Sequence, residues 1–303
     1  MTVEAPIRTT RRDPGLRRIE PRDLVALAFI ADAQPVDVGA LRFVMGCSAE
    51  IVRRRVRCWR DLRLVNVNVV ALHRANVVTL TPAGRELLAD RLGRNVETLW
   101  CPRGLPDEAH LDHHTSAVRL HAALMAACAR AEKPPVRLVL VEHERDVRRR
   151  LGAGSGAGVQ VPDLIVIVEN EREERHAVLV EIDQGGSASP RVVAAKIDSY
   201  LRRRASGATV HGFASWSVVS LTAGASLRRV HRLAVAVNEL VGPMGDFVAF
   251  GLATEVDDRS VLTDGVWKQL VALEDAARLM PVNPFRRPIT TTRDVRQTGP
   301  VAP

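Results

Sequence analysis

The sequence predicts a mixed fold of the α+β or α/β class, arranged in two folded units. Helical periodicity dominates from residue 21 to about residue 62, and two short β-prone runs, LVNVNVVAL and NVVTLTP, follow it. From about residue 110 onward, apolar β-branched runs alternate with helical segments. A length of 303 residues with 46% hydrophobic residues is sufficient for two cores of ordinary size.

The composition of successive segments predicts the domain boundaries. We expect a disordered basic arm over 1–20 and a first folded domain over 21–94. Residues 95–109 contain two prolines and no clear period, so they are predicted to form a linker. A second domain is expected over 110–280, and the proline- and threonine-rich residues 281–303 are expected to be a disordered tail.

The first domain has the element order of a winged helix-turn-helix domain. One helix begins at Pro21, a short second helix ends at Gly46, and Ser48 is the natural N-cap of a third. The two β-prone runs would form the wing, and a closing helix begins at Pro82. In such domains the third helix enters the major groove of DNA.

Arginines cluster on one face of this third helix and are the candidate DNA-binding residues. They are Arg53, Arg54, Arg57 and Arg60. Guanidinium groups suit both phosphate contacts and the reading of guanine edges, so double-stranded DNA is the expected partner. The alternatives are a solvated face, or a face that docks another protein.

Charge and cysteine usage restrict the class of protein. The formal net charge is +8 and comes mostly from arginine, which permits a polyanionic partner, although part of the arginine excess reflects general composition. The four cysteines are scattered without a C-x-x-C pair, so reduced thiols are expected rather than disulfides or a zinc site. With neither a signal peptide nor a membrane-spanning run, we expect a cytoplasmic protein without a membrane partner.

Carboxylates gather at the ends of two apolar runs near the middle of the chain. VPDLIVIV opens on Asp163, and AVLVEIDQGG closes on Glu181 and Asp183. If the runs pair as a hairpin, Asp163 lies near the other two, and strand alternation puts Glu181 and Asp183 on one face. Repulsion among such carboxylates is relieved by a hard cation such as Mg²⁺. Alternatively, these residues only mark where the strands meet water.

A predicted helix after these strands adds Lys196 and Tyr200, which are four residues apart and therefore share one face. Tyr200 is expected to pack against the sheet. Four histidines over 110–121 have no metal-ligand pattern and are expected to pack at a helix start.

The order of these elements resembles the PD-(D/E)xK nuclease fold, which is also called restriction-endonuclease-like. Over roughly residues 20–255, the chain resembles the bacterial replication-relaxation family. The resemblance is carried by VVTLTPAGRELL, HHTSAVRLHAAL, VEHE, VPDLIVIV, VLVEIDQGG and KIDSYLRRR. It implies replication initiation or DNA relaxation on a plasmid or mobile element.

The resemblance also implies roles for particular residues. Asp163 and Glu181 would hold Mg²⁺, with Mn²⁺ as a substitute, and Glu142 or Glu144 would add an upstream ligand. Asp183 stands where the nuclease pattern has lysine, and Lys196 would supply the missing amine from the helix. The candidate catalytic residues are therefore Asp163, Glu181, Asp183 and Lys196, and the candidate metal ligands are Asp163, Glu181 and Glu142.

Three functions are consistent with the sequence. The first is a DNA-binding protein with a metal-dependent nicking endonuclease activity in its second domain. The second is a non-catalytic regulator in which a degenerate nuclease fold serves dimerisation or partner binding. The third is a protein-interaction adaptor. Expected partners beyond DNA are a second copy of the chain and replication proteins.

Overall fold

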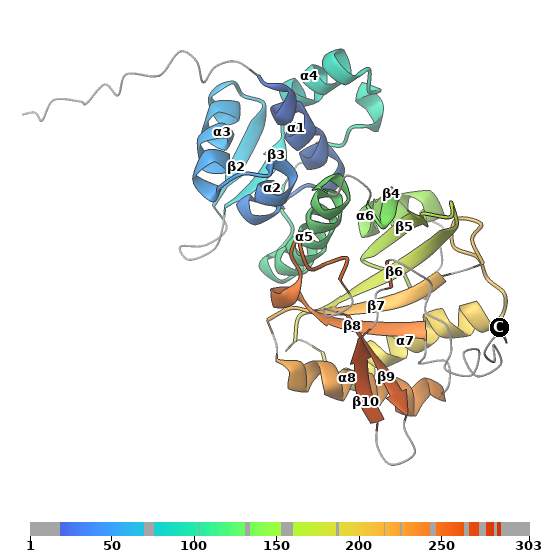
Figure 1. Cartoon of the computed structure of the whole chain (residues 1–303). Coiled ribbons are helices and arrows are strands. Elements are labelled where there is room, and N and C mark those ends of the chain that lie inside the picture. Colours follow the sequence, from blue (N-terminus) through green and yellow to red (C-terminus); the bar gives the residue numbers. More distant parts are fainter. Residues whose placement is uncertain are drawn as a thin grey trace, which may run out of the picture.

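The computed structural model describes residues 19–285, except for 70–75, 103, 131–133, 153–159, 186–187, 215, 225, 243–246, 264–266, 273–276 and 282–283. The chain contains helices and two β-sheets, so the predicted mixed α+β class is confirmed (Figure 1). Most of the predicted arm and tail, and the tip of the predicted wing, lie outside the described residues.

The N-terminal elements are helices around a small three-stranded sheet. They are α1 (Pro21–Ala33), β1 (Val36–Asp37), α2 (Val38–Met45), α3 (Ala49–Asp61), β2 (Val65–Asn68), β3 (Val77–Leu80), α4 (Pro82–Leu92) and the 3₁₀ turn η2 (Val96–Thr98). The strand order is β1-β3-β2, and both pairings are antiparallel. Local chemistry sets the helix starts: the side chains of Asp37, Ser48 and Thr81 each accept a backbone N–H of the helix that follows.

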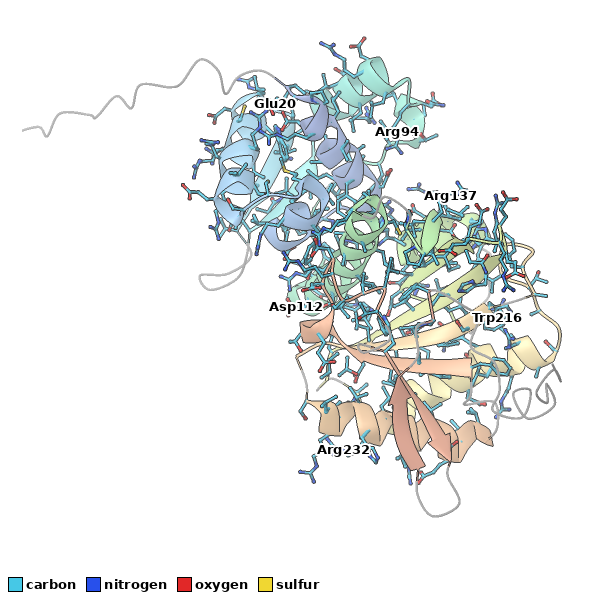
Figure 2. The ribbon with its side chains drawn as sticks, in the orientation of Figure 1. Glu20, Arg94, Asp112, Arg137, Trp216 and Arg232 are labelled. Carbon is cyan, nitrogen blue, oxygen red and sulfur yellow. The ribbon has the colours of Figure 1, made fainter. Side chains whose placement is uncertain are left out.

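A buried ion pair lies inside the N-terminal core. Arg55 of α3 donates from Nε to Oδ1 of Asp23 at 2.9 Å, and its Nη2 contacts Oδ2 of the same carboxylate. The side chains of Arg55 and Asp23 are almost fully buried. Glu20, which is labelled at the start of α1 in Figure 2, has its Oε1 3.6 Å from Nη1 of Arg55. This pair fixes α3 against α1.

The remaining elements build a seven-stranded sheet with helices on both faces. They are α5 (Glu108–Arg130), β4 (Val136–His143), α6 (Glu144–Leu151), β5 (Leu164–Asn170), β6 (Arg175–Asp183), α7 (Pro190–Ala205), β7 (Trp216–Thr222), α8 (Leu227–Val241), β8 (Val248–Leu252), η4 (Ala253–Glu255), β9 (Lys268–Ala272) and β10 (Ala277–Pro281). The strand order is β10-β9-β8-β7-β6-β5-β4. Strands β4, β5 and β6 are mutually antiparallel, whereas β7 runs parallel to β6 and β8 parallel to β7.

Strand alternation divides the buried side chains of this sheet between two layers. Ile165 and Leu179 pack with α7 and α8 on one face. Leu164 and Val180 pack with α5 on the other face. Helix α5 also contributes to the N-terminal core through Val118 and Ala122, so it joins the two sheets (Figure 1).

Among the described residues, none of the helices combines the length and the apolar character that a membrane crossing requires.

Candidate active site

The β5–β6 hairpin brings Asp163 and Glu181 face to face. Leu164 pairs with Val180, and the backbone N–H of Asp163 donates to the Val180 carbonyl at 3.0 Å. Continuing this register by one residue places Asp163 opposite Glu181, on the sheet face that α7 covers. The predicted hairpin is therefore confirmed, and it brings these two predicted site residues together.

Asp163 is held from three directions. Its Oδ2 accepts the backbone N–H of Ile182 at 2.7 Å. Its Oδ1 lies 2.8 Å from His113 Nε2 of α5 and 3.8 Å from Lys196 Nζ of α7. The carboxylate is thus fixed by the neighbouring strand and by helices from both sides of the sheet.

Two side chains of α7 hold the carboxylate of Glu181. Tyr200 donates its hydroxyl to Glu181 Oε1 at 2.6 Å, and Lys196 Nζ contacts Oε2. Because Lys196 and Tyr200 are one helical turn apart, a single helix face supplies both donors. Lys196 therefore lies between the two carboxylates, as expected for an amine that reaches back from the helix.

Burial and mutual repulsion dominate the electrostatics of this cluster. Burial, together with the charge of Asp163, raises the pKa of Glu181 to about 8 even though Lys196 opposes this shift. For Lys196, burial acts against protonation, but the charges of Glu181 and Asp163 outweigh it and raise its pKa. Burial likewise disfavours the protonated form of His113, but Asp163 outweighs it and the His113 pKa is raised.

The basic side chains of the cluster are the ones that are exposed to solvent. The side chains of Asp163 and Glu181 are only 4% and 3% exposed, whereas those of His113 and Lys196 are each 29% exposed. A phosphate that approaches the buried carboxylates would therefore first meet an imidazole and an ammonium group. This arrangement is typical of a site for an anionic substrate.

Asp183 does not join the cluster. Both of its carboxylate oxygens accept from Arg229 of α8, at 2.9 and 3.0 Å, and Oδ1 also accepts the backbone N–H of Gly185. The side chain of Asp183 is 1% exposed and that of Arg229 is 8% exposed. The residue in the lysine position of the nuclease pattern thus anchors α8 to the end of β6, and we do not assign it a catalytic role.

The structure separates the two upstream glutamates. Glu142 accepts from Arg150 and His211, and in the described part of the chain it makes no contact with Asp163 or Glu181. We therefore do not include Glu142 among the metal ligands. Glu144 is the nearer candidate, because its backbone N–H donates to the Asp163 carbonyl at 3.0 Å. Its negative charge also raises the pKa values of His113 and Lys196.

The cluster fits a divalent cation by the chemistry of its donors. Within the described residues there is no group of three His, Cys, Asp or Glu side chains placed as metal ligands. Magnesium, however, is commonly held by only one or two carboxylates, with water and substrate phosphate completing its shell. Asp163 and Glu181 provide those two carboxylates.

The predicted DNA-contacting arginines all reach the surface of α3. Arg53, Arg54, Arg57 and Arg60 are exposed, and Arg60 lies 3.5 Å from Asp61. The fifth arginine of this helix, Arg55, is the buried partner of Asp23. The face named from the sequence is therefore an exposed, strongly positive surface.

The sequence did not reveal the site contact of His113 or the hydrogen bond of Tyr200. His113 was assigned only to helix packing, but it contacts Asp163 from a different part of the chain. Tyr200 was correctly expected to be buried, yet its hydrogen bond to Glu181 was not anticipated.

No protein-family model, curated protein or solved structure matches this chain. The chemistry of the cluster is therefore inferred from its own side chains.

Proposed function

We propose that this chain is a DNA-binding protein whose second unit hydrolyses phosphodiester bonds with the help of Mg²⁺ held by Asp163 and Glu181. The observation that carries the proposal is the placement of Lys196 Nζ between two buried carboxylates that face one another across the β5–β6 hairpin. Mn²⁺ would substitute for Mg²⁺. The biological setting that we propose is replication initiation or DNA relaxation on a plasmid or mobile element, and it rests on the order of the sequence motifs.

The arrangement of elements supports a nuclease-like assignment of the second unit. Helix α5, the antiparallel strands β4, β5 and β6, helix α7 and the parallel strand β7 follow in the order of the PD-(D/E)xK core. The N-terminal helices and antiparallel strands likewise follow the order of a winged helix-turn-helix domain. The order of helices and strands supports the assignment of a fold, but it does not by itself support an activity.

The proposed chemistry divides the cluster into charged groups that act and groups that position them. A bound Mg²⁺ supplies Lewis-acid polarisation of the scissile phosphate and lowers the pKa of the attacking water. Lys196 stabilises the negative charge that develops on the phosphate. The Ile182 N–H and His113 fix the orientation of Asp163, and Tyr200 fixes that of Glu181.

Nicking of supercoiled plasmid DNA by the full chain tests this function. We expect strand breakage that requires Mg²⁺ or Mn²⁺ and that falls by at least about a hundredfold in Asp163→Asn, Glu181→Gln and Lys196→Ala. Glu142→Gln is the matched control and is expected to nick at the wild-type rate, because Glu142 is bound by Arg150 and His211 and, among the described residues, contacts neither carboxylate. Equal nicking by the wild type and all variants would identify a contaminating nuclease.

One observation favours a second candidate function, a winged-helix regulator with a degenerate nuclease fold. The position of the motif lysine is taken by Asp183, which is locked to Arg229. If the wild type binds DNA but does not nick it with either metal ion, this second function replaces the first.

DNA binding through α3 has its own signature in the salt dependence of affinity. Each phosphate contact that is removed should lower the slope of log affinity against log salt by about 0.9. Changing Arg53, Arg54 and Arg57 together to alanine is expected to lower this slope by about 2 to 3. The measurement is fluorescence anisotropy of a labelled duplex over a range of salt concentrations. An unchanged slope would remove α3 from the interface.

A further inference from the structure

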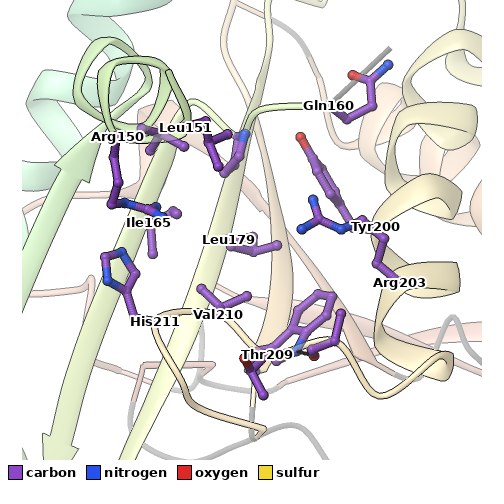
Figure 3. A pocket seen from close by; sticks show the side chains of 14 residues that line it. Arg150, Leu151, Gln160, Ile165, Leu179, Tyr200, Arg203, Thr209, Val210 and His211 are labelled. Atoms are coloured by element: carbon purple, nitrogen blue, oxygen red, sulfur yellow. Dashed lines mark hydrogen bonds between the residues drawn. The ribbon is translucent and has the colours of Figure 1, made fainter. Parts of the chain in front are cut away.

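A cavity of about 80 Å³ lies beside Asp163 and Glu181, here called the acid pair, on the same face of the sheet. Figure 3 shows the side chains that line this cavity. Ile165 and Leu179 form part of its floor, and they are two residues along β5 and β6 from Asp163 and Glu181. Two residues along a strand correspond to about 7 Å. A nucleotide whose phosphate is held at the acid pair could therefore place its base in the cavity.

Tyr200 forms the partition between the cavity and the acid pair. Its side chain lines the cavity, while its hydroxyl donates to Glu181 at 2.6 Å. A group bound in the cavity would touch the residue that orients Glu181. The two sites are therefore physically joined through one side chain.

The cavity has an apolar floor and a polar mouth. Ile165, Leu179 and Trp216 are almost fully buried and give the floor an aliphatic and aromatic character. At the mouth, Figure 3 shows Arg150 and His211 on one side and Gln160 and Arg203 on the other. Planar heterocycles bind in this way, with the ring on apolar surface and the edges at polar groups.

Some polar side chains at the mouth of the cavity are already hydrogen-bonded within the protein, whereas others could bond a ligand. Arg150 and His211 are both engaged by Glu142. The side chains of Gln160, Arg203 and Thr209 make no hydrogen bond or ion pair with another described residue. An amide, a guanidinium and a hydroxyl are thus free to bond the edge of a bound ring or its phosphate.

We propose that this cavity binds a single-ring, pyrimidine nucleobase of the strand whose phosphate lies at the acid pair. The proposal rests on the proposed function for the identity of that strand. At about 80 Å³ the cavity is small, so we assign it the smaller, single-ring bases. A base inside a duplex cannot reach such a cavity, so the bound nucleotide is unstacked or single-stranded.

Nucleotide binding by the full-length protein, without divalent metal, tests the proposal separately from cleavage. The probes are dTMP, dGMP and deoxyribose 5-phosphate, and binding is measured by saturation-transfer NMR and calorimetry. We expect dTMP to bind about five- to a hundredfold more tightly than deoxyribose 5-phosphate, because a bound base typically contributes that much. Binding of dGMP is expected to be weaker than binding of dTMP.

Two variants and one control locate the bound nucleotide. Thr209→Trp fills the mouth from an exposed position, and Arg203→Ala removes its free guanidinium, so each should weaken dTMP binding at least about fivefold. Arg202→Ala is the matched control, because Arg202 is 76% exposed and is held by Asp198. Thermal unfolding midpoints confirm that each variant is folded.

Several results overturn the proposal: equal binding of dTMP and deoxyribose 5-phosphate, dGMP binding as tight as dTMP, or dTMP binding that Thr209→Trp leaves unchanged. If the protein nicks DNA but does not bind dTMP, the cavity assignment fails and the proposed function survives. If it binds dTMP as expected but does not nick, the cavity assignment survives and the proposed hydrolysis fails.

Discussion

Glu181 is a destabilising residue at neutral pH, and this follows from its surroundings. Its pKa is raised to about 8 by burial and by Asp163, whereas the unfolded chain has the ordinary glutamate value of 4.5. Since the folded pKa is the higher one, the stability contributed by the protonated carboxyl is complete below the unfolded pKa. It is lost as the pH rises through about 8. Functional carboxylates commonly lower the stability of the folded protein in this way.

Glu181→Gln is therefore predicted to stabilise the protein. We expect the free energy of unfolding to increase by on the order of 2 to 3 kcal/mol at about neutral pH, and the gain to disappear near the unfolded pKa. Urea denaturation of the variant and the wild type at both pH values measures it. Glu142→Gln is the matched control with the opposite expected sign, because Arg150 and His211 lower the pKa of Glu142 despite its partial burial. Equal destabilisation by both substitutions would contradict this description of Glu181.

Arg55 and Arg54 are neighbours in sequence, but only the buried Arg55 is expected to contribute to stability. Arg55→Ala leaves Asp23 as an unpaired buried charge and is predicted to lower the free energy of unfolding by about 3 to 5 kcal/mol. Arg54→Ala changes an exposed residue and should alter it by less than about 0.5 kcal/mol. Denaturant titration measures both effects. A similar small effect for the two variants would show that the buried pair does not hold α3.

At the scale of single elements, strand periodicity predicted the hairpin and the acid pair. The runs before Asn170 and after Arg175 are β-branched and of strand length, and their pairing puts Asp163 opposite Glu181. Helical spacing likewise predicted that Lys196 and Tyr200 share a face. These inferences succeeded because the contacts join neighbouring elements, whose geometry is set by local periodicity.

Contacts between distant elements could not be predicted in the same way. His113 reaches Asp163 only because α5 packs across the opposite face of the sheet. Arg229 reaches Asp183 only because α8 packs beside α7. The late strands β9 and β10 were missed because KQLVA and ARLMP are short and do not alternate clearly. Glu142 was assigned to the site because sequence shows where a strand ends but not which partner its last carboxylate finds.

Two buried histidines, His121 and His143, and the half-buried His114 lie where α5 meets β4 and α1. His121 Nδ1 lies 3.0 Å from His143 Nε2, and His114 Nε2 lies 2.9 Å from the Ala33 carbonyl. Burial lowers the pKa of His121 to about 3, and burial and the neighbouring His121 lower that of His143. His143 Nδ1 has no hydrogen-bond partner among the described residues. The junction therefore packs neutral imidazoles that resist protonation.

This histidine junction predicts sensitivity to acid. Because the folded pKa values lie below the unfolded value of 6.5, the stability contributed by the neutral rings is present above 6.5 and is lost as the pH falls. Each histidine adds up to about 1.4 kcal/mol per pH unit to this slope. His121→Phe should remove one such contribution, as measured by urea denaturation over a pH series. His231→Phe, at an exposed position of α8, is the matched control. A wild-type slope for His121→Phe would exclude His121 as a source of the acid sensitivity.

At the scale of the whole molecule, α5 links the N-terminal unit to the seven-stranded sheet. Its Arg119 donates to Asp37 at the start of α2, and His114 contacts the end of α1. The same helix carries His113, which contacts Asp163 of the acid pair. The N-terminal unit and the cluster are therefore joined by one packed helix.

Direct binding of Mn²⁺ to the full chain, followed by electron paramagnetic resonance over a pH series, tests the central claim that Asp163 and Glu181 form a cation site. Binding requires ionised Glu181, so affinity should rise by up to about tenfold per pH unit and level off above about pH 8. Asp163→Asn and Glu181→Gln should abolish this binding, whereas Glu142→Gln should leave it unchanged. Mn²⁺ affinity that is equal in the wild type, Asp163→Asn and Glu181→Gln would contradict the claim.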